Sequence, residues 1–158
     1  MKNKTNAMRQ LDTAKIPYSV LSYPVDENDL SGTHVADTLG LDYKTVFKTL
    51  VARGDKSGIL VLCIPVDREL DLKKAARVTG NKRIEMLEVR ELLSATGFIR
   101  GGCSPIGMKK KYPTYIDKSA LLYPTVAISA GVRGAQLWLS PSDLVAFVNA
   151  TPEDITQV

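Results

Sequence analysis

The sequence is poor in the residues from which many catalytic sites are built. It contains a single histidine, His34, so a Ser-His-Asp or Cys-His device would have to be assembled around that one side chain. Its two cysteines, Cys63 and Cys103, are far apart in the chain and form no disulfide framework. Histidine and cysteine are too few to form a metal-binding pattern, so we predict neither a metal nor another cofactor.

Long hydrophobic runs are also missing. The longest, 59–65, has the length of a strand rather than of a membrane span, and no apolar signal core follows the polar first residues. We therefore expect a cytoplasmic protein without a membrane partner. Hydrophobic residues make up 44% and charged residues 24% of the chain, and its 158 residues predict a single domain over 1–158. The net charge of +4 permits an anionic partner without requiring one.

The order of expected helices and strands predicts the fold class. Helical spacing and capping residues predict helices at 5–15, 34–39, 72–78, 88–95 and 141–149. Apolar runs between turn signals predict strands at 18–23, 46–53, 58–64, 82–86, 114–117, 125–129 and 135–139. This order lacks regular strand–helix alternation, so it predicts an α+β fold around a mixed sheet or barrel. The strand at 58–64 is apolar throughout and is expected at the centre, whereas the polar tail is expected to fray.

One lysine stands out in the strand expected at 46–53. Lys48 shares a largely apolar face with Val46 and Leu50, and the opposite face is also apolar. A strand that is apolar on both faces is typical of burial on both sides, where an ammonium group needs a partner or a function. The alternative is a lysine near a strand end that extends to water.

Two glycine-rich stretches are candidate ligand-binding loops. The first, 96–107, contains four glycines and a proline, and backbone N–H groups exposed in this way suit a carbonyl oxygen that gains negative charge during acyl transfer. In the second, 129–134, Ser129 and Arg133 could contact a hydroxyl or a phosphate. Either stretch could instead be a tight connection without a ligand. Cys103 lies in the first loop with no base beside it, which favours a packing role over a nucleophilic one.

A basic run follows the first glycine loop. Lys109, Lys110 and Lys111 precede Tyr112, and such a patch can contact phosphates or form an ordinary solvated surface. If it contacts phosphates, the expected partner is a nucleic acid.

Four segments in order support a family resemblance. They are 46–50 (VFKTL), 70–74 (LDLKK), 97–110 (GFIRGGCSPIGMKK) and 129–134 (SAGVRG). With them the chain resembles, over about 5–149, the YbaK/EbsC family of Cys-tRNA(Pro) deacylases, relatives of the editing domain of bacterial prolyl-tRNA synthetases. The resemblance implies a compact α+β fold with a mixed, barrel-like sheet and surrounding helices. It also implies an enzyme that clears cysteine from mischarged tRNA(Pro), with the tRNA acceptor end and prolyl-tRNA synthetase as partners.

The resemblance also implies roles for individual residues. The functional lysine of the family falls on Lys48, its glycine-loop position on Gly101 and its tyrosine on Tyr23. Positions that line the family's pocket fall on Thr49, Ser129 and Gly131. Our hypothesis is that the N–H groups of Gly101 and Gly102 hold the developing oxyanion, that Lys48 contacts a phosphate or the ester carbonyl, and that Arg133 and the three consecutive lysines bind substrate and tRNA.

In the family mechanism the substrate's own thiol attacks the ester and releases a thiolactone, so no protein nucleophile is needed. This agrees with the shortage of histidine and cysteine noted above. The chain departs from some members at Gln136, where they carry an acid, and at Leu30 or Ser31, where they carry an aromatic residue. The expected activity extends to Cys-tRNA(Cys) as an additional substrate. The alternatives are a deacylase for another mischarged tRNA such as Ala-tRNA(Pro), or a regulatory tRNA-binding protein that has kept the fold without turnover.

Overall fold

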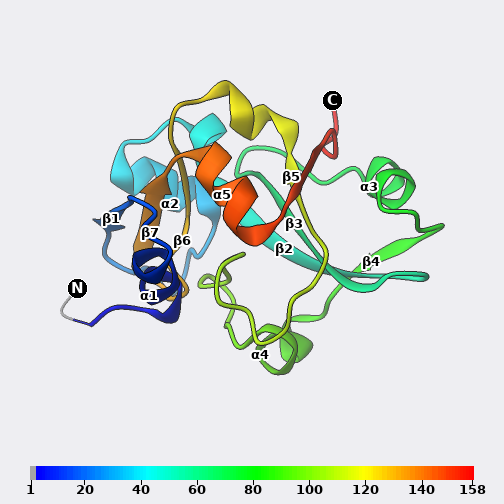
Figure 1. The fold of residues 1–158 in the computed structure, drawn as a ribbon, viewed down its shortest axis with the longest axis horizontal. Helices are drawn as coiled ribbons and strands as arrows, with labels where there is room; N and C mark the ends of the chain where they lie inside the picture. The colour runs from blue at the N-terminus through cyan, green and yellow to red at the C-terminus, as the bar shows by residue number, and fades with distance from the viewer. Residues whose placement is uncertain (1–2) are drawn as a thin grey trace.

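The computed structural model describes residues 3–158, which form two β-sheets with helices packed around them (Figure 1). A three-stranded antiparallel sheet has the order β1 (Ser19–Ser22), β7 (Ala135–Leu139), β6 (Val126–Ser129). A five-stranded sheet has the order β4 (Ile84–Met86), β2 (Phe47–Gly54), β3 (Gly58–Pro65), β5 (Thr114–Asp117), β8 (Thr151–Glu153). Because β3–β5 and β5–β8 are parallel and the other pairs antiparallel, this sheet is mixed. The predicted α+β class with a mixed sheet is confirmed.

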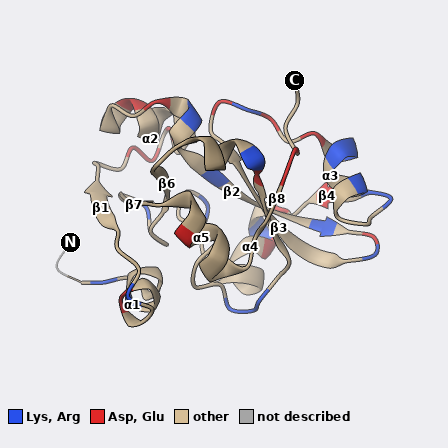
Figure 2. Cartoon of the chain, turned by 45° about the horizontal axis from the view of Figure 1, so that its top comes forward, with Lys and Arg blue, Asp and Glu red and all other residues tan. Residues whose placement is uncertain are grey.

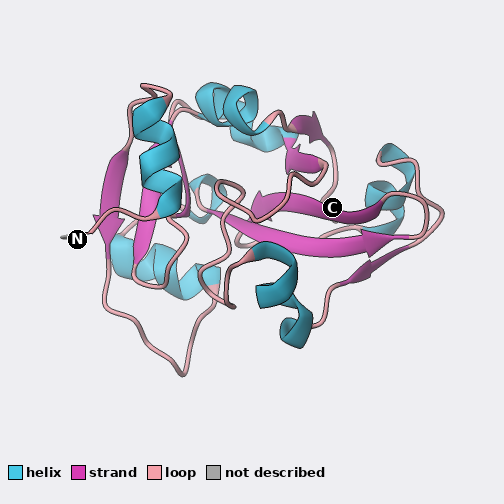
Figure 3. Ribbon diagram, turned by 60° about the horizontal axis from the view of Figure 1, so that its bottom comes forward, coloured by secondary structure: helices cyan, strands magenta, loops and turns pink. Residues whose placement is uncertain are grey.

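The expected barrel does not close in the described chain. The two sheets meet at one parallel bridge, between Val46 and Ala127, and beyond it β2 leaves β6 and pairs with β4 only from Ala52 to Gly54. Between these contacts, the edge of β2 at 48–50 has no neighbouring strand on that side. Figure 3 shows the long β2–β3 pair extending away from the three-stranded sheet. The barrel therefore stays open because β2 diverges from β6.

The helices begin at residues that can cap them. They are α1 (Asn6–Thr13), α2 (Gly32–Leu39), α3 (Leu72–Val78), α4 (Val89–Thr96) and α5 (Pro141–Val148), with 3-10 turns at Tyr43–Thr45 and Lys118–Leu122. A side-chain oxygen accepts a hydrogen bond from a first-turn N–H at Thr5, Ser31, Asp71 and Ser140. The sequence-predicted helices are confirmed to within about two residues at most ends, whereas the two 3-10 turns were not predicted.

The apolar strands divide the interior into two main cores. One face of β2 and β3, with Phe47 and Cys63, packs against α1 and the three-stranded sheet. The opposite face, with Leu62 and Ile64, packs under α3. Residues 60–66, which are most of β3 and the residue that follows it, are all buried. β3 also lies between β2 and β5, so the prediction of a central strand is confirmed.

The prediction that the C-terminal tail frays is wrong. β8 adds a parallel strand to β5, and Ile155 beyond it is fully buried in the core under α3. The Ile155 N–H donates to the Asp117 carboxylate at 3.2 Å, and its carbonyl accepts from the Asp71 N–H at 2.8 Å. Ile155 is the buried apolar residue that holds the otherwise polar tail against the core, and the local composition of the tail does not reveal this.

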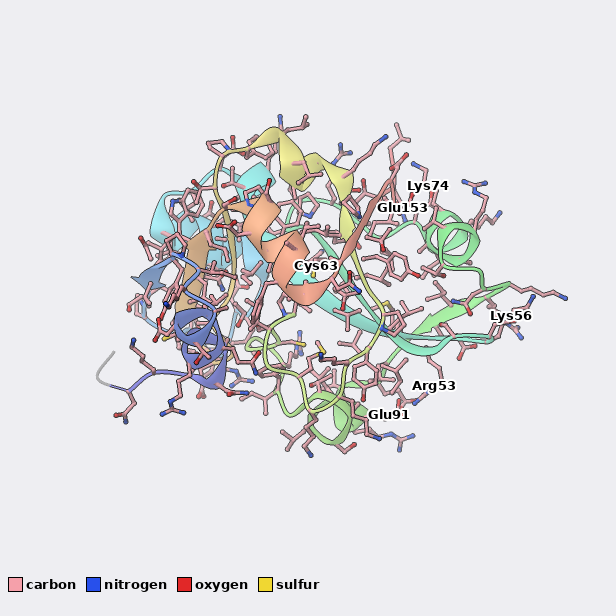
Figure 4. All side chains as sticks on the ribbon, in the orientation of Figure 1. Arg53, Lys56, Cys63, Lys74, Glu91 and Glu153 are labelled. Carbon is pink, nitrogen blue, oxygen red and sulfur yellow. The ribbon has the colours of Figure 1, made fainter. Side chains whose placement is uncertain are left out.

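The Asn81 side chain forms hydrogen bonds to the turn of the β2–β3 hairpin, and its contribution to stability can be measured. Its Oδ1 accepts from the N–H groups of Lys56 and Ser57, both at 2.9 Å, while Nδ2 donates to the hydroxyls of Ser57 and Thr79. Asn81 is buried, whereas Lys56 projects from the hairpin tip (Figure 4). We expect Asn81→Ala to lower the free energy of unfolding by about 2 kcal/mol, because turn N–H groups lose their acceptor.

Urea denaturation measures this loss. Asn28→Ala is the matched control, since Asn28 is exposed and its side chain makes no hydrogen bond within residues 3–158. Equal stability of both variants would show that the hairpin holds without Asn81.

Candidate active site

A cavity of about 840 Å³ lies where β2 leaves β6. Its walls come from the start of β2, the segment before and into α2, the chain after β3, the first glycine loop and the ends of β6 and β7. Four sequence-predicted site residues, Lys48, Thr49, Gly101 and Ser129, line this cavity together. The tertiary structure thus brings the two glycine loops and the lysine strand to one place.

Lys48 lies half-buried on the face of β2 that it shares with Leu50, as the sequence predicted. It is the register partner of Ile64, and Leu50 packs against the core under α3. No carboxylate within residues 3–158 lies within ion-pair distance of its ammonium group. A half-buried ammonium without a protein partner is available to a negatively charged or carbonyl-bearing ligand.

Thr49 presents its backbone to the cavity. Its hydroxyl lies 3.9 Å from the Cys63 sulfur, towards the core. The Val51 carbonyl accepts from the Leu87 N–H at 3.0 Å, on the β4 side of β2. Backbone groups alternate along a strand, so the N–H and C=O of Thr49 lie on this same edge, in the stretch without a neighbouring strand. Thr49 therefore offers the cavity one main-chain donor and one acceptor.

The first glycine loop contains a β-turn over 99–102 in which only one glycine N–H is engaged. The Gly102 N–H donates to the Ile99 carbonyl at 3.0 Å, and Gly101 has φ +84°, the value of a type II turn at its third position. A Cβ on Gly102 would lie 3.2 Å from Val132 backbone atoms, so this glycine allows the two loops to touch. The Gly101 N–H has no acceptor within residues 3–158.

Three of the predicted substrate-binding residues lie beside the main cavity and not in its wall. Tyr23 and Arg133 line a small crevice together with His34, and this crevice shares Gly101 with the main cavity. Arg133 Nε donates to the Arg100 carbonyl at 2.8 Å. Gly131, with φ +99°, packs against the ring of Phe98. Arg133 and Gly131 thus contact residues of the first glycine loop, and none of the three residues lines the main cavity.

Gln136 is a cavity residue that was not among the predicted site residues. It is 6% exposed, lies beside its strand partner Ser129 and lines the main cavity, and its Oε1 has no hydrogen-bond partner within residues 3–158. An unsatisfied buried carbonyl oxygen costs on the order of 1–3 kcal/mol, which favours a role in ligand contact. The signal in the sequence was a lone polar residue inside an otherwise apolar strand.

Sequence and structure comparisons assign the family. Residues 31–147 match the aminoacyl-tRNA editing domain. The chain belongs to this family. It is 46% identical to EbsC of Enterococcus faecalis, named as a candidate Cys-tRNA(Pro)/Cys-tRNA(Cys) deacylase, over 97% of this chain and 93% of that protein. It is 32% identical to a proline–tRNA ligase of Thermosipho africanus over 48% of this chain but only 13% of the ligase.

A solved structure shows the same editing-domain fold. A crystal structure described as a candidate trans-editing enzyme for prolyl tRNA synthetase superposes with a TM-score of 0.83 at 26% identity, covering 99% of this chain and 100% of the other. The resemblance inferred from four sequence segments is thereby confirmed, and the fold of the relatives extends over the whole described chain.

The editing domain holds no protein thiol suited to nucleophilic attack at neutral pH. Burial raises the pKa of the Cys103 thiol, in the main cavity, to about 12, and it does the same for Cys63 in the interior beneath α5 (Figure 4). His34 lies 3.7 Å from Asp29 and faces the small crevice. Within residues 3–158 no group of three or more His, Cys, Asp or Glu side chains is arranged to hold a metal ion, and no helix is long and apolar enough to cross a membrane.

Two of the three consecutive lysines border a second cavity of the editing domain, of about 610 Å³. Lys110 and Lys111 line it, together with Tyr112 and residues of α5, whereas Lys109 packs its alkyl chain against Gly97. The first glycine loop borders both cavities: Arg100, Gly101 and Cys103 line the first, and 105–108 line the second. Figure 2 shows basic residues in the loop between α4 and β5.

Proposed function

We propose that this chain deacylates Cys-tRNA(Pro) in trans, with the substrate's thiol as the nucleophile. The observation that carries the proposal is a cavity that places the unpaired Lys48 ammonium and the free Gly101 N–H together while its own cysteine stays protonated. Such a site supplies positioning and charge stabilisation and leaves the nucleophile to the substrate. The name of the E. faecalis relative supports the same substrate and adds Cys-tRNA(Cys) as a second one.

The proposed reaction is an intramolecular acyl transfer. The substrate's thiolate sulfur forms a bond to the ester carbonyl carbon, the bond from that carbon to the ribose oxygen breaks, and the ribose oxygen leaves with a proton from water. The products are a thiolactone, which water opens to free cysteine, and the uncharged tRNA. The Gly101 N–H stabilises the oxyanion of the tetrahedral intermediate, and Lys48 binds the terminal phosphate or the carbonyl.

The distribution of charge around the cavity suits the end of an aminoacyl-tRNA. Lys48 and Arg100 provide positive charge for phosphate, whereas Asp29, Asp67 and Glu69 provide negative charge in the same lining. The unpartnered Gln136 carbonyl oxygen is placed to accept a hydrogen bond from the substrate's α-ammonium group. In this proposal Gly102 serves the packing of the two loops and not the oxyanion, because its N–H is engaged within the turn.

The rest of the tRNA is proposed to reach the second cavity. Lys110 and Lys111 line the second cavity, which the same glycine loop borders, and acceptor-stem phosphates could follow the 3′ end along this loop. A domain of this size contacts little of the tRNA, so we propose that prolyl-tRNA synthetase supplies tRNA selectivity in a cytoplasmic complex. Single-turnover deacylation of Cys-tRNA(Pro) by the isolated chain, with and without the synthetase, tests the activity and the partner separately.

The pH dependence of the reaction distinguishes the substrate's thiol from Cys103. A thiolate is the reactive form, so the rate rises with pH until the attacking thiol is ionised. We expect the rate to level off near the ordinary cysteine pKa of about 8.5, the value for an exposed substrate thiol. A Cys103 nucleophile, with its pKa raised to about 12, would instead give a rate that rises throughout the alkaline range.

The matched variant is Cys103→Ala. We expect its rate to stay within about twofold of wild type, with an unchanged pH profile, because a protonated packing residue takes no part in the acyl transfer. A large loss of activity in a folded Cys103→Ala protein would contradict the substrate-thiol mechanism.

A further inference from the structure

The two glycine loops of the editing domain are joined by a side-chain hydrogen bond with a defined direction. Arg133 Nε, from the second loop, donates to the Arg100 carbonyl of the first at 2.8 Å. A Cβ placed on Gly101 would lie 3.3 Å from the same Nε, so the guanidinium packs directly on the Arg100–Gly101 peptide. Within residues 3–158, no other donor contacts the Arg100 carbonyl.

The Arg100–Gly101 peptide is the central unit of the β-turn over 99–102, and that unit can adopt two orientations. Type I and type II turns keep the outer hydrogen bond, here Gly102 N–H to Ile99, and differ by a flip of the central peptide. A glycine at the third position permits either turn, and its φ of +84° corresponds to type II here. The local sequence therefore leaves the orientation open, and a tertiary contact can decide it.

In this orientation the Gly101 N–H points away from Arg133. Peptide bonds of the described chain are trans, so the N–H of Gly101 is antiparallel to the carbonyl of Arg100. Arg133 lines only the small crevice, whereas Gly101 borders both the crevice and the main cavity. A peptide whose carbonyl is held by Arg133 directs its N–H away from that side chain, and Gly101, unlike Arg133, also borders the main cavity.

We propose that Arg133 is a positioning residue: by holding the Arg100 carbonyl, it selects the turn in which the Gly101 N–H faces the main cavity as an oxyanion donor. This inference rests on the function proposed above. With the peptide flipped, a carbonyl oxygen would face the developing negative charge and the donor would be lost. An arginine suits this task, because its guanidinium is planar, always charged and a rigid donor.

The test compares three variants by kinetics and by NMR. In a type II turn the Hα of Arg100 lies close to the N–H of Gly101 and gives a strong nuclear Overhauser effect, which the flipped peptide loses. We expect a strong effect in the wild type and in the control variant Arg53→Met. The Arg53 side chain pairs with Glu91 at 3.4 Å (Figure 4), and neither residue lines the main cavity. Arg133→Met should weaken the effect and lower kcat for Cys-tRNA(Pro) on the order of tenfold, with KM within about twofold.

Arg133→Lys keeps a cationic donor and should restore part of the nuclear Overhauser effect and part of kcat. This variant also tests the proposal if Arg133→Met fails to fold. The proposal is overturned if the nuclear Overhauser effect stays strong in the Arg133 variants, whether or not activity falls, since Arg133 would then not set the turn. If the wild type deacylates no tRNA, the proposed function fails, yet the same NMR comparison still decides whether Arg133 orients the peptide.

Discussion

Lys48→Ala is expected to lower the rate of Cys-tRNA(Pro) deacylation on the order of 10²–10³-fold, the loss found when one charge-stabilising donor is removed from an acyl-transfer site. The ammonium group has no ion-pair partner within residues 3–158, so its charge is available to the substrate. The same absence means that the variant removes no stabilising ion pair. We therefore expect the thermal unfolding midpoint to change little.

The control is Lys44→Ala. Lys44 is an exposed lysine of the 3-10 turn shortly before β2 and does not line the main cavity. Single-turnover assays over a range of enzyme concentrations separate the two possible roles of Lys48. A fall in the rate constant at saturation indicates contact with the carbonyl, whereas weaker binding alone indicates contact with phosphate. A Lys48→Ala protein as fast as wild type would remove Lys48 from the site.

Replacing the amino acid on the tRNA is expected to have an effect of similar size. Ser-tRNA(Pro) differs from Cys-tRNA(Pro) by one oxygen for one sulfur, so binding is nearly conserved. Its hydroxyl is a weak nucleophile without an adjacent base, whereas a few per cent of a cysteine thiol is thiolate at pH 7. We expect turnover of Ser-tRNA(Pro) to be slower by on the order of 10²-fold or more, measured with radiolabelled amino acids.

Ala-tRNA(Pro) and an S-methylated Cys-tRNA(Pro) complete the substrate panel. Both keep the ester and the α-ammonium group but lack a nucleophile, so both should be nearly inert. Comparable hydrolysis of Ala-tRNA(Pro) would show that water attacks the ester, and the proposed role of the substrate's thiol would be lost while a deacylase function remained. No hydrolysis of any member would favour a regulatory tRNA-binding protein.

Local sequence rules were sufficient for most of the fold. Capping residues such as Ser31 and Asp71 place helix starts, because their side chains satisfy N–H groups that every helix leaves free. The continuous apolar run in β3 predicts its central place, because only a strand covered on both faces can bury it. The rule fails for the tail, where Ile155 fills a site made by α3 and β5.

The candidate site was predictable only in part from the sequence. Lys48 stands out because its charge conflicts with its apolar neighbours, whereas Gly101 was named by the family resemblance and its φ of +84° comes from the structure. Gly102 looks equivalent to Gly101 in the sequence, yet its N–H is engaged and its role is the close contact with the second loop. Substrate contact by Arg133 stays a prediction, and the structure adds that its Nε donates to the Arg100 carbonyl at the small crevice.

The sequence by itself determined the α+β class, most helix and strand positions, the shortage of protein nucleophiles and the identity of the lysine and glycine segments. These properties depend on composition and on neighbours close in the chain. Only the tertiary structure decided that β2 leaves β6 to open the cavity, that Gln136 faces it unpartnered, and that Arg133 holds the Arg100 carbonyl. Each of these depends on contacts between segments far apart in the chain, whose geometry no local pattern encodes.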